Sequence, residues 1–255
     1  MRILAVGDIV GEIGLKKLRE VLPSLKKNEH IDFIVANGEN AADGMGITSS
    51  IFKELLAMGI GAVTMGNHTW GKKDIFNFID NPKLLRPANY PENIPGNEYG
   101  IYECQDKKIG VINLIGRAEI NVLSENPFLK AEKIINEIKD KTDIIIVDFH
   151  AEATAEKIAM GYFLDGKANI VFGTHTHVQT ADEQILENGT AYITDIGMTG
   201  PKKSVIGMSL EASIKRFCTS LPEKYKVAEG ECMLNGVIFE LSDKNKVTKI
   251  ERLCV

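Results

Sequence analysis

Two histidines lie two residues apart in the segment Gly173-Thr174-His175-Thr176-His177, directly after the apolar run 168–172. The chain has only five histidines, so this pair concentrates imidazole chemistry in one place. Alternate residues of an extended chain point to the same side, so both rings can face one way. Neutral imidazole is the commonest metal ligand in proteins. Taken alone, the segment fits a metal site and a surface loop with two histidines equally well.

The same arrangement occurs at four earlier points, where an apolar run is followed by polar residues. The runs 3–6, 33–36, 61–65 and 143–147 are followed, respectively, by Asp8, by Glu39 and Asn40, by Asn67 and His68, and by His150. In open α/β sheets, ligands bind at the carboxyl ends of the strands. We therefore expect these five chain segments to converge on a single site.

Together these positions supply two carboxylates, two amides and four imidazoles. This set is too large for one tetrahedral ion, and it suits two five- or six-coordinate ions that share a carboxylate. Two ions roughly 3.5–4 Å apart can clamp the attacking and leaving oxygens of a phosphoryl displacement. A water molecule between such ions loses a proton near neutral pH and becomes the nucleophile. The pattern indicates metal-dependent phosphoester chemistry.

The elements that would position these residues alternate between strand and helix. Strands at 2–6, at 31–36 and from residue 60 are separated by helical patterns near 15–22, 48–58 and 72–79, which is typical of a parallel βαβ series. The proline-rich stretch 81–99 should be loop and short extended pieces, and 101–103 with 108–114 should form a hairpin. Helices are expected at 130–139, 154–163 and 209–218, and strands at 143–147, 170–172, 183–186, 191–194, 237–241 and 247–253. Two packed sheets with helices outside would fit.

Length and charge narrow the class of protein. The 255 residues are expected to form a single domain, 1–255. A net charge of −5 argues against binding long nucleic acid, but metal ions could still attract a small anionic substrate. No apolar run approaches the roughly 18 residues of a membrane helix, and no export signal is visible, so we expect a cytoplasmic protein. The four scattered cysteines should be reduced and buried. The oligomeric state is left open, a homo-oligomer included.

The ordered blocks resemble those of the calcineurin-like metallophosphoesterases. More closely, the segments 6–11, 37–41, 150–154 and 195–201 look like the bacterial YmdB-type family of 2′,3′-cyclic-nucleotide 2′-phosphodiesterases. This resemblance implies a four-layer αββα sandwich of two mixed β-sheets flanked by helices. It also implies a dinuclear centre of iron, manganese or both, with magnesium or zinc as alternatives, and a small cyclic-nucleotide substrate.

The resemblance also assigns ligands by position. One ion would be held by Asp8, Glu39, Asn40 and His177, and the other by Glu39, Asn67, His150 and His175, with Glu39 bridging. The chain departs from the superfamily pattern at three positions: Val10 replaces a histidine, Glu39 replaces an aspartate, and Thr69 replaces an acidic residue. Asn40 could supply the lost ligand. The first site is then rich in oxygen, which suits hard ions such as Mn²⁺ or oxidised iron.

Three other side chains have more than one interpretation, and Glu152 has one. His68 matches a general acid of the family, and an imidazole suits protonation of a leaving ribose oxygen, but it could instead support a ligand or bind phosphate. Asp148 could orient His150 or be purely structural. Trp70 could stack on a base, although a place in the core is favoured. Glu152 is expected to cap a helix.

The favoured function is hydrolysis of 2′,3′-cyclic nucleotides to 3′-nucleotides, by attack of the metal-bridging hydroxide with His68 as general acid. One alternative is a phosphomonoesterase that acts on nucleotides or phosphoproteins. Another is a metal-stabilised regulatory protein that binds nucleotides without hydrolysing them, and the histidine missing at Val10 favours this reading.

Overall fold

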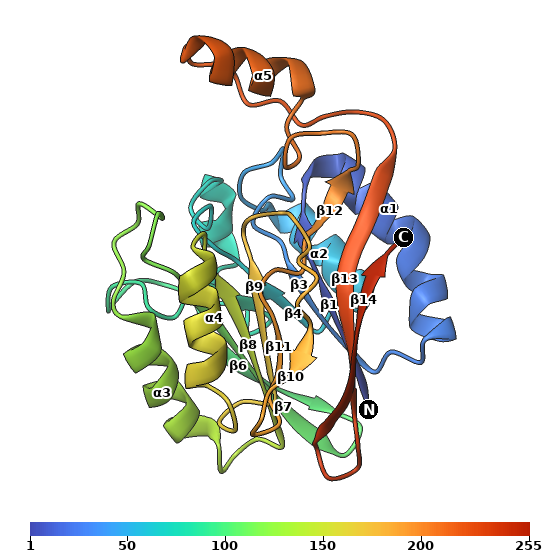
Figure 1. Cartoon of the computed structure of the whole chain (residues 1–255), viewed down its shortest axis with the longest axis vertical. Coiled ribbons are helices and arrows are strands. Elements are labelled where there is room, and N and C mark those ends of the chain that lie inside the picture. Colours follow the sequence, from blue (N-terminus) through green and yellow to red (C-terminus); the bar gives the residue numbers. More distant parts are fainter.

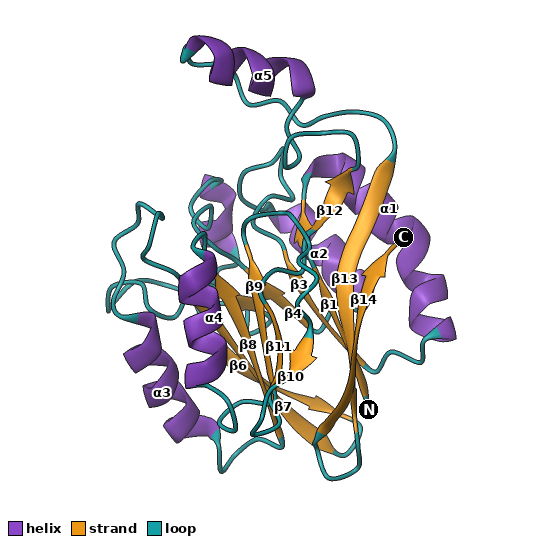
Figure 2. Cartoon of the chain, viewed as in Figure 1, coloured by secondary structure: helices purple, strands orange, loops and turns teal.

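The computed structural model describes residues 1–255 as two mixed β-sheets packed face to face, with helices on both outer sides (Figures 1 and 2). The first sheet has the order β2 (Asp8–Ile9), β12 (Met198–Pro201), β13 (Cys232–Leu241), β1 (Arg2–Val6), β3 (Phe33–Asn37), β4 (Ala62–Thr64) and β5 (Leu84–Leu85), and β14 (Val247–Cys254) pairs with β13. The second has the order β10 (Gln184–Ile185), β11 (Ala191–Ile193), β9 (Ile170–Thr174), β8 (Ile144–His150), β7 (Lys107–Ile115) and β6 (Tyr99–Cys104).

Four of the five helices form the two outer layers (Figure 1). The five helices are α1 (Gly11–Asn28), α2 (Ser49–Ala57), α3 (Pro127–Ile138), α4 (Thr154–Phe163) and α5 (Leu210–Thr219). The first two cover the first sheet and the next two cover the second, whereas α5 projects away from the body (Figure 1). The expected αββα sandwich is confirmed. None of the helices is long and apolar enough to cross a membrane.

Strand periodicity explains why the sheets stack in this way. Successive side chains of a strand point to opposite faces. In β1, Ile3 lies between the two sheets, while Leu4 packs toward α1 and α2. In β8, Ile146 lies between the sheets, while Ile145 packs toward α3 and α4. Each central strand therefore contributes to two layers of the core, and burial on both faces explains the continuous apolar runs of the sequence.

Local signals set the helices. Leu15, Leu18 and Leu22 recur at helical spacing and are the buried face of α1. Thr48 caps α2, because its side chain accepts a hydrogen bond from the backbone N–H three residues later. Asn126 caps α3 in the same way, ahead of a proline in the first turn.

Three expectations need correction. The helix expected at 72–79 is only the 3₁₀ turn η1 (Lys73–Asn77), which buries a single residue, Ile75, and so lacks an apolar stripe. The cysteines are not buried: Cys104 and Cys232 are half-buried, while Cys218 and Cys254 are exposed, because they lie on strand ends or on the projecting α5. The strands β2 and β12 were not predicted, and β5 lies in the stretch 81–99, where short extended pieces were expected without bounds.

Candidate metal centre

The eight predicted site residues lie at strand ends of both sheets. Asp8, Glu39, Asn40, Asn67 and His68 belong to or follow strands of the first sheet, and His150, His175 and His177 end or follow β8 and β9 of the second. The pairs β1–β3, β3–β4 and β8–β9 are parallel, so their carboxyl ends lie at the same edge. The polar clusters therefore meet where the two sheets adjoin.

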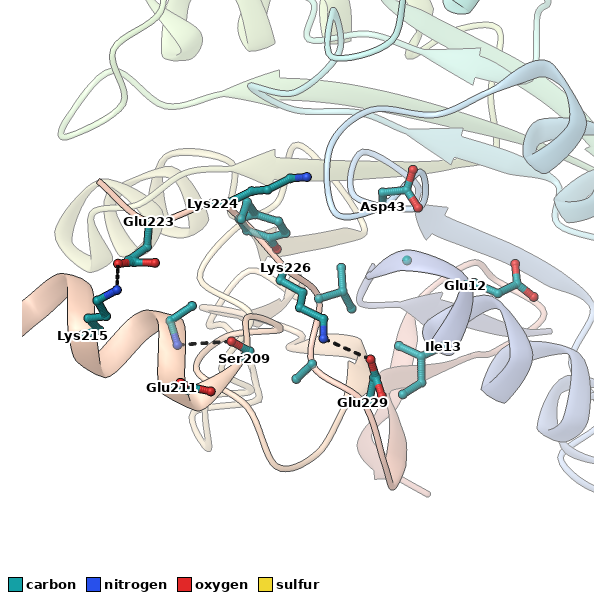
Figure 3. Close-up of a pocket in the computed structure, with 15 residues that line it drawn as sticks. Glu12, Ile13, Asp43, Ser209, Glu211, Lys215, Glu223, Lys224, Lys226 and Glu229 are labelled. Atoms are coloured by element: carbon teal, nitrogen blue, oxygen red, sulfur yellow. Dashed lines mark hydrogen bonds and ion pairs between the residues drawn. The ribbon is translucent and has the colours of Figure 1, made fainter. Parts of the chain in front are cut away.

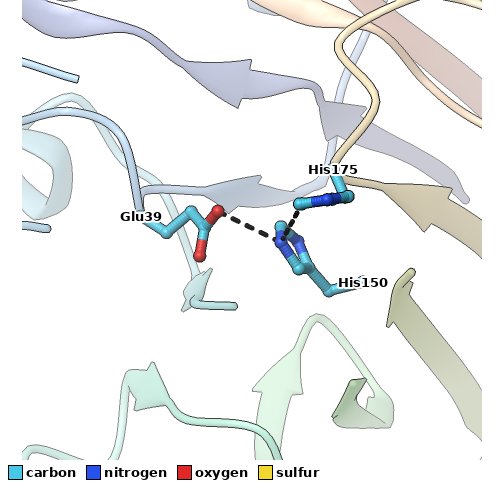
Figure 4. Close-up of side chains that lie close together, drawn as sticks. All are labelled: Glu39, His150 and His175. Atoms are coloured by element: carbon cyan, nitrogen blue, oxygen red, sulfur yellow. Dashed lines mark hydrogen bonds and ion pairs between the residues drawn. The ribbon is translucent and has the colours of Figure 1, made fainter. Parts of the chain in front are cut away.

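Three of these side chains converge on one ring nitrogen of His150, and Figure 4 shows two of them, Glu39 and His175. His150 Nε2 lies 3.1 Å from Glu39 Oε1, 3.0 Å from Asn67 Oδ1 and 3.0 Å from His175 Nδ1. One ring nitrogen carries at most one hydrogen, so it cannot satisfy three partners by hydrogen bonding. The ligand atoms of Glu39, His150 and His175 all lie within 4.8 Å of one another. A cation between them would satisfy every member of the cluster.

A second group of predicted ligands, Asp8, Asn40 and His177, lies beside the cluster around His150. Asp8 is fully buried, and its Oδ1 is 3.8 Å from His177 Nε2 and 4.0 Å from His150 Nδ1. Asp8 Oδ1 and Asn40 Oδ1 are both buried oxygens without a hydrogen-bond partner. The Nδ1 of His177 lies 2.8 Å from the carbonyl oxygen of Ile206, so it is the donor and Nε2 keeps its lone pair. Unpaired buried oxygens are costly unless a ligand meets them, and a cation would do so.

A glycine keeps the centre open. A Cβ built on Gly66 would collide with the ring of His150 and with the carboxylate of Glu39. Because the position carries no side chain, the two ligating groups can face a common point. The nitrogen and oxygen donors around this point suit first-row transition ions. The residues present therefore fit the metal centre that the sequence predicts.

Charge coupling inside the centre is strong. Burial alone would raise the pKa of Glu39, but His150 and the backbone N–H of His68 hold it at about 2. Burial alone would lower the pKa of His150, but Glu39 and Asp8 raise it to about 9. Burial and the neighbouring His150 lower the pKa of His175 to about 3. Burial raises the pKa of Asp8. The centre thus holds buried carboxylates that require a positive partner, which a metal ion would provide.

Asp148 orients His150 through a hydroxyl. Its carboxylate accepts hydrogen bonds from Thr64 and Thr174, and Thr174 Oγ1 lies 2.9 Å from His150 Nδ1. This contact fixes the ring so that Nε2 faces the cluster. Burial raises the pKa of Asp148 to about 7. Of the two interpretations of Asp148, the structure supports the one in which it orients His150.

A buried ion pair holds the loop that carries the last two histidines. Lys157 Nζ is 2.6 Å from Asp195 Oδ2 and donates to the carbonyl oxygen of Thr174 at 2.8 Å. The same carboxylate accepts from the backbone N–H and hydroxyl of Thr176. His175 and His177 have φ values of 99° and 65°, a strained region for residues other than glycine. Lys157 had no signal in the sequence, and Asp195 appeared only inside a family block.

A polar hollow of about 290 Å³ opens onto the centre. Besides the expected ligands, its lining includes His68, Glu152, Ile206, Met208 and Tyr225. The backbone N–H of His68 donates to Glu39 Oε2 at 2.9 Å. Glu152 does not cap α4, because the capping position is Ala153. Instead, Glu152 Oε2 lies 3.1 Å from His175 Nε2.

The remaining wall comes from the 202–230 segment, which carries α5. Ile206, Met208 and Tyr225 belong to it, and no motif pointed to them. A larger hollow of about 760 Å³ lies between this segment and the start of α1 (Figure 3). Its lining carries charges of both signs, some of them paired, as Lys215 with Glu223 at 2.7 Å and Lys226 with Glu229 at 3.3 Å, so it offers no concentrated positive charge to an anionic substrate.

Comparisons with known proteins agree with this architecture. The chain matches the model of the family described as YmdB-like protein over residues 4–253. It is 51% identical over 257 residues to the 2′,3′-cyclic-nucleotide 2′-phosphodiesterase of Bacillus subtilis (strain 168), covering 100% of this chain and 97% of that protein. A crystal structure described as a novel phosphatase of Mycoplasma pneumoniae has a TM-score of 0.94 and 36% identity, covering 100% of this chain and 93% of the other. A 5′-nucleotidase precursor of Thermus thermophilus shares the fold alone, with a TM-score of 0.57 and 11% identity over 100% of this chain and 54% of the other. The chain belongs to the YmdB-like family, within the metallophosphoesterase fold.

Proposed function

We propose that this protein hydrolyses 2′,3′-cyclic nucleotides to 3′-nucleotides with the help of two metal ions. That it is a phosphoester hydrolase follows from its family membership and from the curated relative that it resembles over its whole length. The specific reaction is supported by the name of that relative. The observation that carries the metal-dependent chemistry is the convergence of Glu39, Asn67 and His175 on Nε2 of His150.

The two ions would be shared between the two groups of side chains. Asp8, Glu39, Asn40 and His177 would hold one ion, and Glu39, Asn67, His150 and His175 would hold the other. The first set is rich in oxygen, which favours Mn²⁺ or oxidised iron. When bound, the ions would activate a water molecule and neutralise charge on the phosphoryl oxygens. The protein's own contribution is to orient the ligands, as Asp148 and Glu152 do for His150 and His175.

His68 is the proposed general acid. Its side chain lines the polar hollow next to Asn67, and its backbone is fixed by Glu39. From this wall the imidazole would give its proton to the 2′ oxygen as the bond between that oxygen and phosphorus breaks. The ribose then keeps its phosphate on the 3′ oxygen.

The test begins with metal analysis of the purified protein, followed by assays with Mn²⁺ on 2′,3′-cyclic AMP. We expect His68→Ala to lower kcat by about 10²–10⁴-fold with its metal content retained, and Glu39→Gln to lose both metal and turnover. His30→Ala is the matched control, because His30 is exposed and lies before β3, at the opposite end of the strand from Glu39. Unchanged turnover in both site variants would overturn the mechanism. Stable nucleotide binding without turnover would support the regulatory alternative instead.

A phosphomonoesterase is the second candidate, because the M. pneumoniae structure is described as a phosphatase. The rates on p-nitrophenyl phosphate and bis-p-nitrophenyl phosphate separate the two activities. A phosphodiesterase should favour the second compound, and a phosphomonoesterase should favour the first.

A further inference from the structure

An apolar hollow of about 470 Å³ lies on the other side of the turn that carries Asn67 and His68. We name it the aromatic hollow, and its walls include Asn67, Trp70, Phe76, Tyr90, Ile94 and Val122. Asn67 contributes the only amide side chain of the lining, and no lining residue is charged. The walls come from the loops after β4, before β6 and after β7, which meet beside the metal centre.

Three aromatic rings are arranged in parallel within it. The rings of Trp70 and Phe76 have centroids 5.5 Å apart and are inclined by only 9°, and Trp70 and Tyr90 are 6.2 Å apart at 26°. Trp70 is 37% exposed and Phe76 is 57% exposed, so the expectation that Trp70 belongs to the core was wrong. A soluble protein rarely leaves stacked aromatic faces open to water without a ligand to cover them. Flat aromatic faces of this kind stack on nucleobases.

The aromatic hollow is tied to the metal centre by two contacts. Asn67 lines it, and the Oδ1 of this same side chain lies 3.0 Å from His150 Nε2. The hydroxyl of Tyr90 donates to the carbonyl oxygen of Gly66 at 3.0 Å, which fixes the aromatic wall to the turn beside Asn67. His68, the next residue, lines the polar hollow instead. One turn therefore separates a charged site from an apolar one.

We propose that the aromatic hollow binds the nucleobase of a nucleotide whose phosphate lies at the metal centre. A nucleoside cyclic phosphate has the same layout, with an anionic group and a flat ring joined by a ribose. This inference rests on the proposed function for the position of the phosphate. Because the walls hold no charge and their one amide faces His150, the site recognises the base by stacking rather than by its hydrogen-bonding edge. Purines should therefore bind better than pyrimidines, with little discrimination between adenine and guanine.

Trp70 makes a direct binding test possible, because it is the only tryptophan of the chain. The metal-loaded protein is titrated with 3′-AMP and, in parallel, with base-free ribose 5-phosphate, while tryptophan emission is recorded. We expect saturable quenching by 3′-AMP only. Phe76→Ala, which keeps Trp70, should weaken 3′-AMP binding by roughly 5- to 150-fold. Phe217→Ala on α5 removes an exposed phenylalanine elsewhere and should change nothing.

Kinetics give a second readout. The preference for a base is measured as kcat/KM on 2′,3′-cyclic AMP divided by kcat/KM on base-free ribose 2′,3′-cyclic phosphate. Trp70→Ala should lower this preference at least fivefold. An unchanged ratio, or emission that responds equally to 3′-AMP and ribose 5-phosphate, would overturn the base site. Failure of the proposed function can be told apart from failure of the base site. If the proposed function were wrong, the wild-type protein would hydrolyse neither compound, and the tryptophan emission titration alone would test the base site. Absence of any quenching would leave the hollow to an apolar partner and refute the inference.

Discussion

Gly66 leaves the space in which the side chains of His150 and Glu39 meet, although it has no side chain to contribute. The position has no left-handed φ, so alanine is compatible with the backbone, but the added Cβ would collide with His150 and Glu39. We predict that Gly66→Ala keeps its far-UV circular dichroism and loses most of its bound metal, measured by elemental analysis. Gly110→Ala is the control, because its Cβ would closely approach the tips of two side chains, Ile138 and Thr142, and would make only an ordinary contact with the backbone. Full metal content in Gly66→Ala would contradict this account of the centre.

At the scale of single residues, residue type and position in the sequence explain which site side chains could be predicted. His150 and Glu39 follow buried apolar runs, and such runs alone are enough to place these residues at strand ends. Glu152 carries no comparable signal, because its contact with His175 depends on where the next helix begins. A core position is expected for Trp70 because large aromatic residues usually bury most of their surface. Its exposure depends on how three loops pack, which periodicity does not describe.

At the scale of elements, the loop after β9, which carries His175 and His177, is held in its conformation by a buried ion pair. Lys157 of α4 and Asp195 are both almost fully buried, so removing one partner leaves a charge without compensation. We predict that Lys157→Met lowers the free energy of unfolding by about 3–5 kcal/mol, measured by urea denaturation. The double variant Lys157→Met with Asp195→Asn should recover part of this loss, because it removes the stranded charge.

A surface pair provides the comparison. Lys202 and Glu231 are 3.1 Å apart and largely exposed, so Lys202→Met should cost at most about 1 kcal/mol. If Lys157→Met cost no more than this control, the buried pair would not be what holds the loop.

Long elements were predictable from the sequence and short ones were not. The β6–β7 hairpin and the α3 and α4 helices have enough residues for their periodicity and caps to appear. The strands β2 and β5 have only two residues each, and their pairing is determined by partners distant in sequence. The 202–230 segment reaches the polar hollow for the same reason, through tertiary packing that leaves no local pattern.

At the scale of the whole molecule, the two sheets share one apolar layer. Ile3 and Val237 of the first sheet lie in the same buried cluster as Ile146 and Phe172 of the second. Neither sheet could expose this layer to water without a large loss of hydrophobic stabilisation. The candidate metal centre also draws its predicted ligands from both sheets. The single-domain organisation expected for residues 1–255 therefore has a physical consequence: the sheets should unfold together.

This coupling can be measured with a probe in one sheet and a perturbation in the other. Trp70 follows β4 of the first sheet and reports its unfolding by fluorescence, while Ile146 lies fully buried in β8 of the second. We predict that Ile146→Ala lowers stability by about 2–5 kcal/mol, and that the urea midpoint of Trp70 fluorescence shifts as much as that of far-UV circular dichroism. Leu129→Ala, on the exposed face of α3, should move neither midpoint appreciably. If the Trp70 midpoint stayed in place while the dichroism midpoint fell, the sheets would be separate folding units and the single-domain prediction would be wrong.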